Sequence, residues 1–259
     1  MSLQNHDDSL LLEKRILELA GRADASCTFA FTDFLGLFEQ DIFRRIQNRL
    51  PRGVGYTCFG GAEGAERMMV RFGDVEELGY EIPFPIVMLH IVPRAPKFAQ
   101  KLSHRDALGA LMHLGIEREM LGDIVLREEG QEIFVFAHEK IAPFIESELK
   151  SIRNTQVMVS VCEELPEGEL YHTQSVIVKA MSERLDGIIA KVYSLSREEA
   201  SGYFARSLVF VEGRCITSPS YIPKANERIS VRGLGRFLYE GYISDTKKGK
   251  LNLRVQKYV

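Results

Sequence analysis

The order of apolar segments between residues 85 and 161 constrains the fold more than any other feature of this chain. Short apolar runs indicate strands, and apolar residues that recur every three or four positions indicate helices. The expected elements are a strand over 85–93, a helix over 103–114, strands over 124–127 and 133–137 around Glu129-Gly130, a helix over 139–152 and a strand over 157–161. This β-α-β-β-α-β order is that of the ferredoxin-like fold, which many RNA-binding modules and many unrelated domains share.

Two aromatic residues of this segment need a separate interpretation. Phe134 and Phe136 lie two residues apart, so they share one face of their strand. In RNA-recognition domains such aromatics stack on bases. Because buried phenylalanines are common in strands, packing in a core is the better interpretation here.

The residues before this segment predict a separate α+β unit that ends near residue 80. Apolar residues recur in a helical pattern in two places, and two alternating runs then indicate a pair of strands. The expected elements are a helix over 9–21 ended by Gly21, a helix over 32–50 capped by Thr32 with Asp33, and strands over 54–60 and 67–73.

The last third of the chain predicts two short helices followed by a strand and a turn. Ser182 opens the first helix, and Ser196 with Glu199 has the S-x-x-E spacing of a capping box at the start of the second. The apolar stripe of the first helix consists of Leu185, Ile188, Ile189 and Val192. A strand and turn are expected over 208–213, and a strand over 172–179 is expected to lead into this part.

Net charge separates this C-terminal part from the rest of the chain. Residues 182–259 carry 14 Lys and Arg against 8 Asp and Glu, a net charge of +6, whereas the preceding residues carry −9. The whole-chain value of −3 hides this asymmetry. A basic segment attached to an acidic body indicates that the segment binds a polyanion.

Several cations of the C-terminal part are placed where they can contact a nucleic-acid backbone. Arg184 and Lys191 lie seven residues apart, so both can face one side of the first helix. Arg197 lies in the first turn of the second helix, where the helix dipole disfavours a cation by roughly 0.3–1 kcal/mol, and this local conflict suggests a function. Further cations in strand and turn sequence are Lys224, Arg228, Arg232 and Arg236. For each of these cations alone, a solubilising role explains its presence as well as RNA contact does. Because they occur together in one basic segment, the set favours RNA binding.

Patterns that would indicate an enzyme are incomplete. His104-Arg105-Asp106 resembles a protein-kinase catalytic loop, but the Asn that should follow five residues later is Leu111. No nucleophile motif and no His or Cys cluster with metal-ligand spacing is present, so no cofactor is expected. Catalytic residues can come from distant parts of a sequence, so an enzyme is not excluded. Its candidate residues are His104, Arg105 and Arg118, which would have to meet in one pocket. The alternative is that these residues only form a helix start and surface cations.

The start and the apolar content of the chain predict a cytoplasmic protein, and a monomer is expected. Residues 1–8 contain no basic region followed by an apolar core, and no apolar run approaches the ~20 residues needed to cross a bilayer. The four cysteines never form C-x-x-C, so reduced thiols are expected. No membrane partner is predicted.

Short motifs along the chain resemble two known groups of proteins. Arg184-Leu185-Asp186, Ser196-Arg197-x-x-Ala200, the Val-x-Val strand, Pro219 and Val231-Arg232-Gly233 resemble the S-four RNA-binding domain. Stretches over 31–35, 59–67, 104–111 and 114–124 are similar to the YlmH family of bacterial proteins. The resemblance implies an α+β protein of three domains: an N-terminal α+β unit over 1–80, a ferredoxin-like, RRM-like RNA-binding domain over 81–165, and an αα-β S-four domain over 182–259.

The family resemblance implies a non-enzymatic factor that associates with the large ribosomal subunit. Some members stabilise peptidyl-tRNA on obstructed subunits during ribosome-associated quality control, and the family has been linked to cell division. The implied partners are rRNA of the large subunit and tRNA or peptidyl-tRNA. The alternatives are an RNA- or tRNA-modifying enzyme targeted by its S-four domain and a protein-interaction factor linked to cell division.

The resemblance also implies roles for single residues. Arg184, Asp186 and Arg197 match RNA-facing or orienting positions, with Asp186 expected to orient an arginine, and Lys191 and Arg206 are expected to contact phosphate. The RNA-binding candidates are Arg184, Asp186, Lys191, Ser196, Arg197, Arg206, Lys224, Arg232 and Arg236. Secondary candidates for RNA contact are Lys101, His104, Arg105 and Arg118.

Two positions depart from the family pattern around the Val-x-Val strand. Ser207 stands where the family usually has glycine before the strand, and Glu212 stands where it usually has asparagine after it. The second change is expected to place an acidic group beside the RNA surface, and Gly213 is expected to supply the turn.

Overall fold

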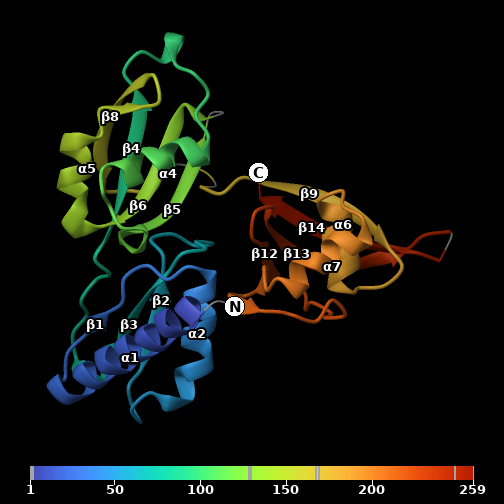
Figure 1. Cartoon of the computed structure of the whole chain (residues 1–259), viewed down its shortest axis with the longest axis horizontal. Coiled ribbons are helices and arrows are strands. Elements are labelled where there is room, and N and C mark those ends of the chain that lie inside the picture. The colour runs from blue at the N-terminus through green and yellow to red at the C-terminus, as the bar shows by residue number, and fades with distance from the viewer. Residues whose placement is uncertain (1–2, 128–129, 167, 169, 248, 259) are drawn as a thin grey trace. The chain divides into compact units, whose positions relative to one another are not determined.

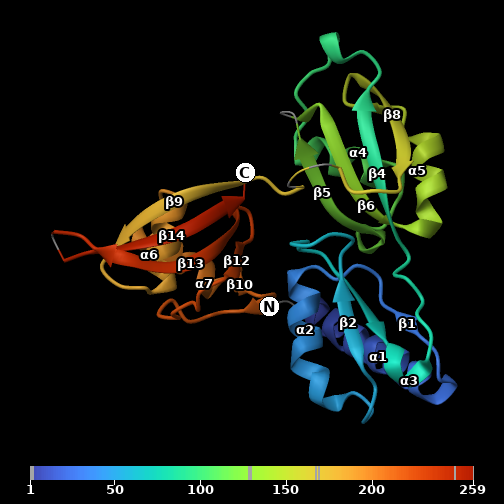
Figure 2. The ribbon, with the colours of Figure 1, turned by 180° about the vertical axis from the view of Figure 1, so that it is seen from behind.

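The computed structural model describes residues 3–127, 130–166, 168, 170–247 and 249–258. Helices and antiparallel sheets form an α+β protein, as predicted (Figure 1 and Figure 2). The chain divides into two compact units, Met1–Leu170 and Tyr171–Val259. Among the described residues, no helix is both long enough and apolar enough to span a bilayer.

The N-terminal part of the first unit is a small antiparallel sheet packed against two helices. Its elements are α1 (Leu3–Ser26), β1 (Ala30–Phe31), α2 (Leu37–Ile46), β2 (Tyr56–Phe59), β3 (Met69–Phe72) and α3 (Val75–Leu78), with the strands in the order β1-β3-β2. Ile16 of α1 and Phe43 of α2 are buried against Phe72 of β3. The strand pair predicted from alternation is confirmed as β2 and β3.

Two predicted helix boundaries in this part are wrong. The first helix continues through Gly21, because the burial of Ala23 in the apolar core outweighs the cost of a helical glycine, about 1 kcal/mol. The second helix begins at Leu37, not at residue 32. The Thr32 hydroxyl accepts a hydrogen bond from the amide of Val70 at 2.9 Å, so it ties the chain to β3 and caps no helix.

The central part of the first unit is one sheet with two helices on one face. Its elements are β4 (Ile86–Pro93), α4 (His104–His113), β5 (Leu121–Arg127), β6 (Glu132–His138), α5 (Ala142–Glu148), β7 (Ser151–Ile152) and β8 (Thr155–Cys162). The strand order β5-β6-β4-β8-β7 is that of the ferredoxin-like fold with one short strand added at the edge. The predicted order of elements is therefore confirmed, while the turn predicted at Glu129 lies outside the described residues.

The second helix of this part is shorter than predicted. α5 begins at Ala142, after a 3-10 turn over Glu139–Ile141, and ends at Glu148. Ser151–Ile152 pairs with β8 and cannot continue the helix. The apolar side chains that indicated a helix to residue 152 include Ile152, which is buried in the core as part of a strand.

Arg67 and Asp123 hold the N-terminal part against the central sheet. The carboxylate of Asp123 accepts hydrogen bonds from the amides of Glu66 and Arg67 at 2.8 and 2.9 Å. The Arg67 guanidinium donates to the carbonyls of Leu121 and Phe34 at 2.8 and 2.9 Å. The bonds to Asp123 and Leu121 run to β5 of the central sheet, whereas the bond to Phe34 stays within the N-terminal part. This part of the sheet is therefore contacted by the protein itself.

The second unit is a six-stranded antiparallel sheet with two helices on one face. Its elements are β9 (Thr173–Ala180), α6 (Leu185–Val192), α7 (Arg197–Ala205), β10 (Val209–Val211), β11 (Arg214–Cys215), β12 (Glu227–Val231), β13 (Gly235–Asp245) and β14 (Leu251–Tyr258). The strand order is β11-β10-β12-β13-β14-β9, so the strand expected over 172–179 is an edge strand of this sheet. The predicted apolar stripe of α6 is buried against β12, β13 and β14.

The two departures from the family pattern take up strained backbone conformations. Ser207 and Glu212 have φ values of +57° and +48°, in the left-handed region that glycine and asparagine occupy at least cost. The Glu212 carboxylate accepts a hydrogen bond from the Arg228 amide at 2.6 Å and lies 3.5 Å from the Arg228 guanidinium. The negative charge of Glu212 is therefore paired within the sheet. Gly213, with φ of +73°, completes the turn.

Ser207→Gly should raise the free energy of unfolding of the second unit by about 0.5–1 kcal/mol, because glycine removes the left-handed strain at this position. Urea unfolding of the full chain would measure the change. Ser201→Gly in the interior of α7 is the matched control, and it should lower stability by about 0.5–1 kcal/mol. A loss of stability in both variants would contradict the strain at Ser207.

Candidate RNA interface

A buried carboxylate holds two arginine side chains at the start of α6. The Asp186 side chain is 4% exposed and accepts hydrogen bonds from Nε and Nη2 of Arg184 at 3.2 and 3.1 Å. Nε of Arg197 donates to the same carboxylate at 3.2 Å. The side chains of Arg184 and Arg197 are 42% and 63% exposed. The carboxylate is thus hidden, whereas both guanidiniums reach solvent.

The loop before β12 fixes the backbone at the start of α6. The first amides of a helix have no partner within the helix. Here the amide of Leu185 donates to the Tyr221 carbonyl at 2.8 Å, and that of Asp186 donates to the Pro219 carbonyl at 3.2 Å. Lys224, three residues beyond Tyr221, is exposed in the same loop. Lys224 and Pro219 both belong to predicted patterns, but no pattern in the sequence connects them to the start of α6.

The capping box predicted at the start of α7 is confirmed. The Ser196 hydroxyl accepts from the Glu199 amide at 3.2 Å, and the Glu199 carboxylate accepts from the Ser196 amide at 2.7 Å. This cap makes Arg197 the first residue of the helix, and its side chain turns back to Asp186 on α6. Ser196 therefore positions Arg197 through the backbone.

The charges of the group are stabilised by their mutual contacts. Burial raises the pKa of the Asp186 carboxyl, but hydrogen bonds from Arg184, Arg197 and the Gly187 amide outweigh burial and leave this pKa below its ordinary value. The bond to Asp186 also raises the pKa of Arg184. All three side chains are charged at neutral pH, so the group presents an excess of positive charge to solvent.

Three other predicted cations lie apart from this group. The Arg206 guanidinium, at the end of α7, lies 4.7 Å from the centre of the Tyr203 ring. The amide of Arg232 donates to the carbonyl of Leu208 at 2.9 Å, so the turn between β12 and β13 lies close to the end of α7. Lys191 is exposed on α6. Their contact with RNA stays a prediction.

Arg236 lies on the face of the sheet opposite to α6 and α7. Its neighbour Phe237 is buried under the helices, and successive side chains of a strand point to opposite faces. The Arg236 guanidinium lies 4.6 Å from the Tyr171 ring centre and 4.3 Å from that of Tyr258. These contacts tie the first residue of the unit to its last strand, and no pattern in the sequence connects the two tyrosines.

The aromatic side chains of the central sheet are not available to stack on bases. Phe134 and Phe136 are 2% and 1% exposed, so their predicted core packing is confirmed. Phe134 stacks on the His90 ring at 4.7 Å between centres. A Cβ atom added to Gly61 would lie 2.3 Å from the Phe136 ring, so the turn of the N-terminal part approaches this ring as closely as glycine permits.

Arg118 and His104 lie near the contact between the N-terminal part and the central sheet. The Arg118 guanidinium donates to the Leu121 carbonyl at 2.7 Å, and burial together with the Arg67 guanidinium lowers the pKa of Arg118 to about 10. Burial and the charge of Arg118 lower the pKa of His104. Lys101 is exposed just before α4.

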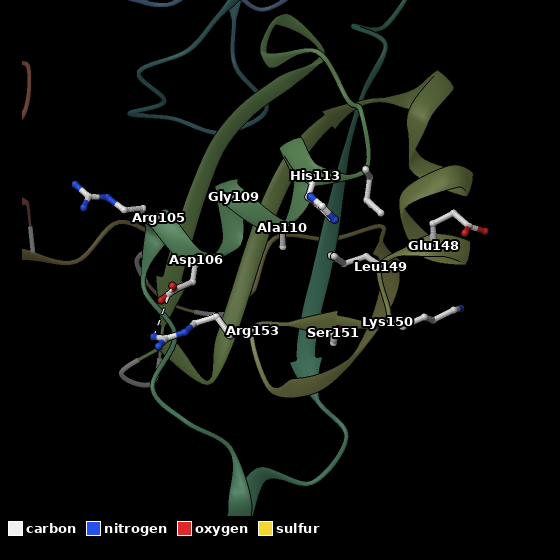
Figure 3. Close-up of a pocket in the computed structure, with 11 residues that line it drawn as sticks. Arg105, Asp106, Gly109, Ala110, His113, Glu148, Leu149, Lys150, Ser151 and Arg153 are labelled. Carbon is white, nitrogen blue, oxygen red and sulfur yellow. Dashed lines mark ion pairs between the residues drawn. The ribbon is translucent and has the colours of Figure 1, made fainter.

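A groove of about 490 Å³ lies beside α4 in the central part (Figure 3). Arg105 lines this groove, together with the ion pair between Asp106 and Arg153 at 3.7 Å, but His104 and Arg118 do not. The three groups that the enzyme alternative requires therefore do not converge here. In the described part of the chain, no three His, Cys, Asp or Glu side chains are grouped so as to hold a metal ion.

Comparison with known proteins adds sequence matches to this geometry. Residues 81–165 match the family described as "Putative RNA-binding domain in YlmH". The chain is also 27% identical over 234 residues to the "Ribosome-associated protein quality control protein P2" of Bacillus subtilis (strain 168), a match that covers 87% of this chain and 86% of that protein. The resemblance to YlmH proteins that the sequence motifs indicated is thus confirmed by a family match and by a relative.

A solved structure of a YlmH protein is also similar. It is the "Cell division protein ylmH from Streptococcus pneumoniae", at 19% identity and a TM-score of 0.46. The similarity covers 62% of this chain and 93% of that chain.

Asp186→Asn should lower the free energy of unfolding by about 1–3 kcal/mol at pH 6, because an amide cannot accept from both guanidiniums and the Gly187 amide. The depressed pKa of Asp186 means that its stabilisation is present above the unfolded pKa of about 4 and is lost as the pH falls through the folded pKa. In urea unfolding at pH 6, 4 and 3, the free energies of unfolding of wild type and Asp186→Asn should therefore become more similar as the pH falls.

Glu198→Gln is the matched control for this measurement, because Glu198 is exposed on the same helix. It should change stability by no more than about 0.5 kcal/mol. A difference between wild type and Asp186→Asn that stays constant from pH 6 to pH 3 would show that the carboxylate contributes nothing through its charge.

Proposed function

We propose that this protein is a non-enzymatic RNA-binding factor that associates with the large ribosomal subunit. It stabilises peptidyl-tRNA on obstructed subunits during ribosome-associated quality control. It acts in the cytoplasm as a monomer, without a cofactor or a membrane partner. The observation that carries the proposal is the pair of exposed arginines held by the buried Asp186 carboxylate.

The arginine pair suits a phosphate backbone for physical reasons. A guanidinium donates hydrogen bonds in a fixed plane and keeps its charge, so it binds phosphate oxygens well. Arg184 and Arg197 share one anchor, so their orientation is partly set before RNA arrives, which reduces the entropy lost on binding. Contacts of this kind supply affinity for RNA of any sequence, and the shape of the A-form helix supplies selectivity.

The charge distribution supports placing RNA contact on the second unit. Residues 182–259 carry a net charge of +6, whereas the preceding residues carry −9. The sheet face of the central part, which RNA-recognition domains use for stacking, has its two phenylalanines buried. The family match describes residues 81–165 as RNA-binding, so a contact from the central part would have to use another surface.

The names of the relatives support the ribosomal part of the proposal. The Bacillus subtilis relative is named for ribosome-associated quality control, and its match extends over most of both chains. An enzyme delivered by its RNA-binding domain would need a pocket with convergent polar groups. The groove beside α4 contains Arg105 without His104 or Arg118, so no observation favours that alternative.

Co-sedimentation with purified large subunits, empty or carrying peptidyl-tRNA, tests the proposal. The wild-type protein should prefer the obstructed subunit, and Arg184→Ala/Arg197→Ala should lose most of the binding. Because each lost phosphate contact lowers the slope of log affinity against log salt by about 0.7–0.9, the slope of the double variant should be smaller by roughly 1.4–1.8.

Arg214→Ala/Arg254→Ala is the matched control, because it removes two exposed arginines of the same unit that lie outside the candidate group. It should keep the preference for obstructed subunits. Equal binding to empty and obstructed subunits would refute the role in quality control, and equal losses in both double variants would refute the assignment of the contact to Arg184 and Arg197.

A further inference from the structure

The β13–β14 hairpin extends beyond the strand beside it. β13 pairs with β12 only from Gly235 to Tyr239, but its pairing with β14 continues to Asp245. Figure 1 and Figure 2 show the end of this hairpin projecting from the C-terminal unit. The turn at its end therefore lies beyond the part of the sheet that β12 covers.

Hydrogen bonds of Thr246 with Gly249 and Lys250 close the end of the hairpin. The Thr246 amide donates to the Lys250 carbonyl at 2.6 Å, and the Gly249 amide donates to the Thr246 carbonyl at 3.0 Å. The Thr246 hydroxyl also accepts from the Lys250 amide at 2.9 Å.

The turn carries a local excess of positive charge. Lys247 and Lys250 are exposed, and Lys179 of β9 is exposed opposite Asn252 of β14. None of these three lysines forms an ion pair with any described residue. The sequence adds Lys248 between them, a residue outside the described part of the chain. The charge at the tip is therefore available to a partner.

The neighbouring acidic side chains do not cancel this charge. The Glu240 carboxylate lies 3.7 Å from Nε of Arg254 and accepts from the Gln256 amide group at 3.0 Å. Burial and the nearby Asp245 carboxylate raise the pKa of the Tyr242 hydroxyl. Asp245 has no cationic partner among the described residues, so it offsets part of the charge of the three lysines. Tyr242 is itself 50% exposed, so an aromatic surface lies on the same hairpin as the lysines.

The tip lies at the same end of the sheet as the start of α6. Leu251, the first residue of β14, pairs with Ala180, the last residue of β9. Arg184 follows Ala180 by four residues, so their Cα atoms can be no more than roughly 14 Å apart. One RNA backbone can therefore meet both the arginines held by Asp186 and the lysines of the hairpin.

We propose that Lys247 and Lys250, with Lys179, form a second contact to the RNA phosphate backbone. This inference rests on the proposed function and adds to it a surface that the candidate residues of the sequence analysis did not include. Lysines on an exposed edge strand can also serve to prevent pairing with another sheet. Here Lys247 and Lys250 lie on the turn, not on an edge strand, and at the same end of the sheet as the start of α6, which favours contact with RNA.

The test is the salt dependence of binding of the full chain to purified large subunits. Lys247→Ser/Lys250→Ser should weaken binding and lower the slope of log affinity against log salt by roughly 1.4–1.8, without changing the unfolding midpoint. Lys247→Arg/Lys250→Arg keeps both charges and should keep the slope. Lys14→Ser/Lys140→Ser removes the same charge from exposed positions of the first unit and should also keep it.

The outcomes separate this inference from the proposed function. An unchanged slope in Lys247→Ser/Lys250→Ser, while Arg184→Ala/Arg197→Ala loses binding, would overturn the hairpin contact and leave the proposed function standing. An equal loss of slope in the Lys14→Ser/Lys140→Ser control would also overturn it, because net charge alone would then explain the effect. No binding of the wild-type protein would overturn both.

Discussion

The guanidiniums of Arg184 and Arg197 depend on one buried carboxylate for their orientation. Asp186 accepts from both of them and from a backbone amide, and its side chain is only 4% exposed. A buried carboxylate is stable only if it is paired in this way. The start of α6, the cap of α7 and the loop that carries Pro219 all serve to bring these groups together.

In the first unit, the N-terminal part is packed against the central sheet and limits what else can bind there. Arg67 and Asp123 hold the N-terminal part on the sheet by hydrogen bonds, and Phe136 packs against the turn at Gly61. A ferredoxin-like domain does not by itself specify an RNA-binding face. In this protein the face of the central sheet is covered. The second unit, which has the net positive charge and the exposed arginines, is therefore the better candidate for RNA contact.

The sequence predicts local structure well where one physical signal dominates. The capping box at Ser196, the apolar stripe of α6 and the order of the central elements are confirmed, because each depends on residues close in sequence. The end of α1 at Gly21 was wrong because tertiary burial outweighed helix propensity. The stacking of Arg236 between Tyr171 and Tyr258 joins residues from both ends of the unit, which no local pattern reveals.

The RNA affinity of Asp186→Asn tests the central claim most directly, because the two possible roles of Asp186 predict changes of opposite sign. The substitution removes one negative charge, so electrostatics alone would make binding to a large subunit tighter. If Asp186 acts by orienting Arg184 and Arg197, binding should instead become weaker. The measurement is the affinity of the folded variant at a fixed salt concentration, well below its unfolding temperature. Weaker binding is the result predicted here, and tighter binding would contradict the account.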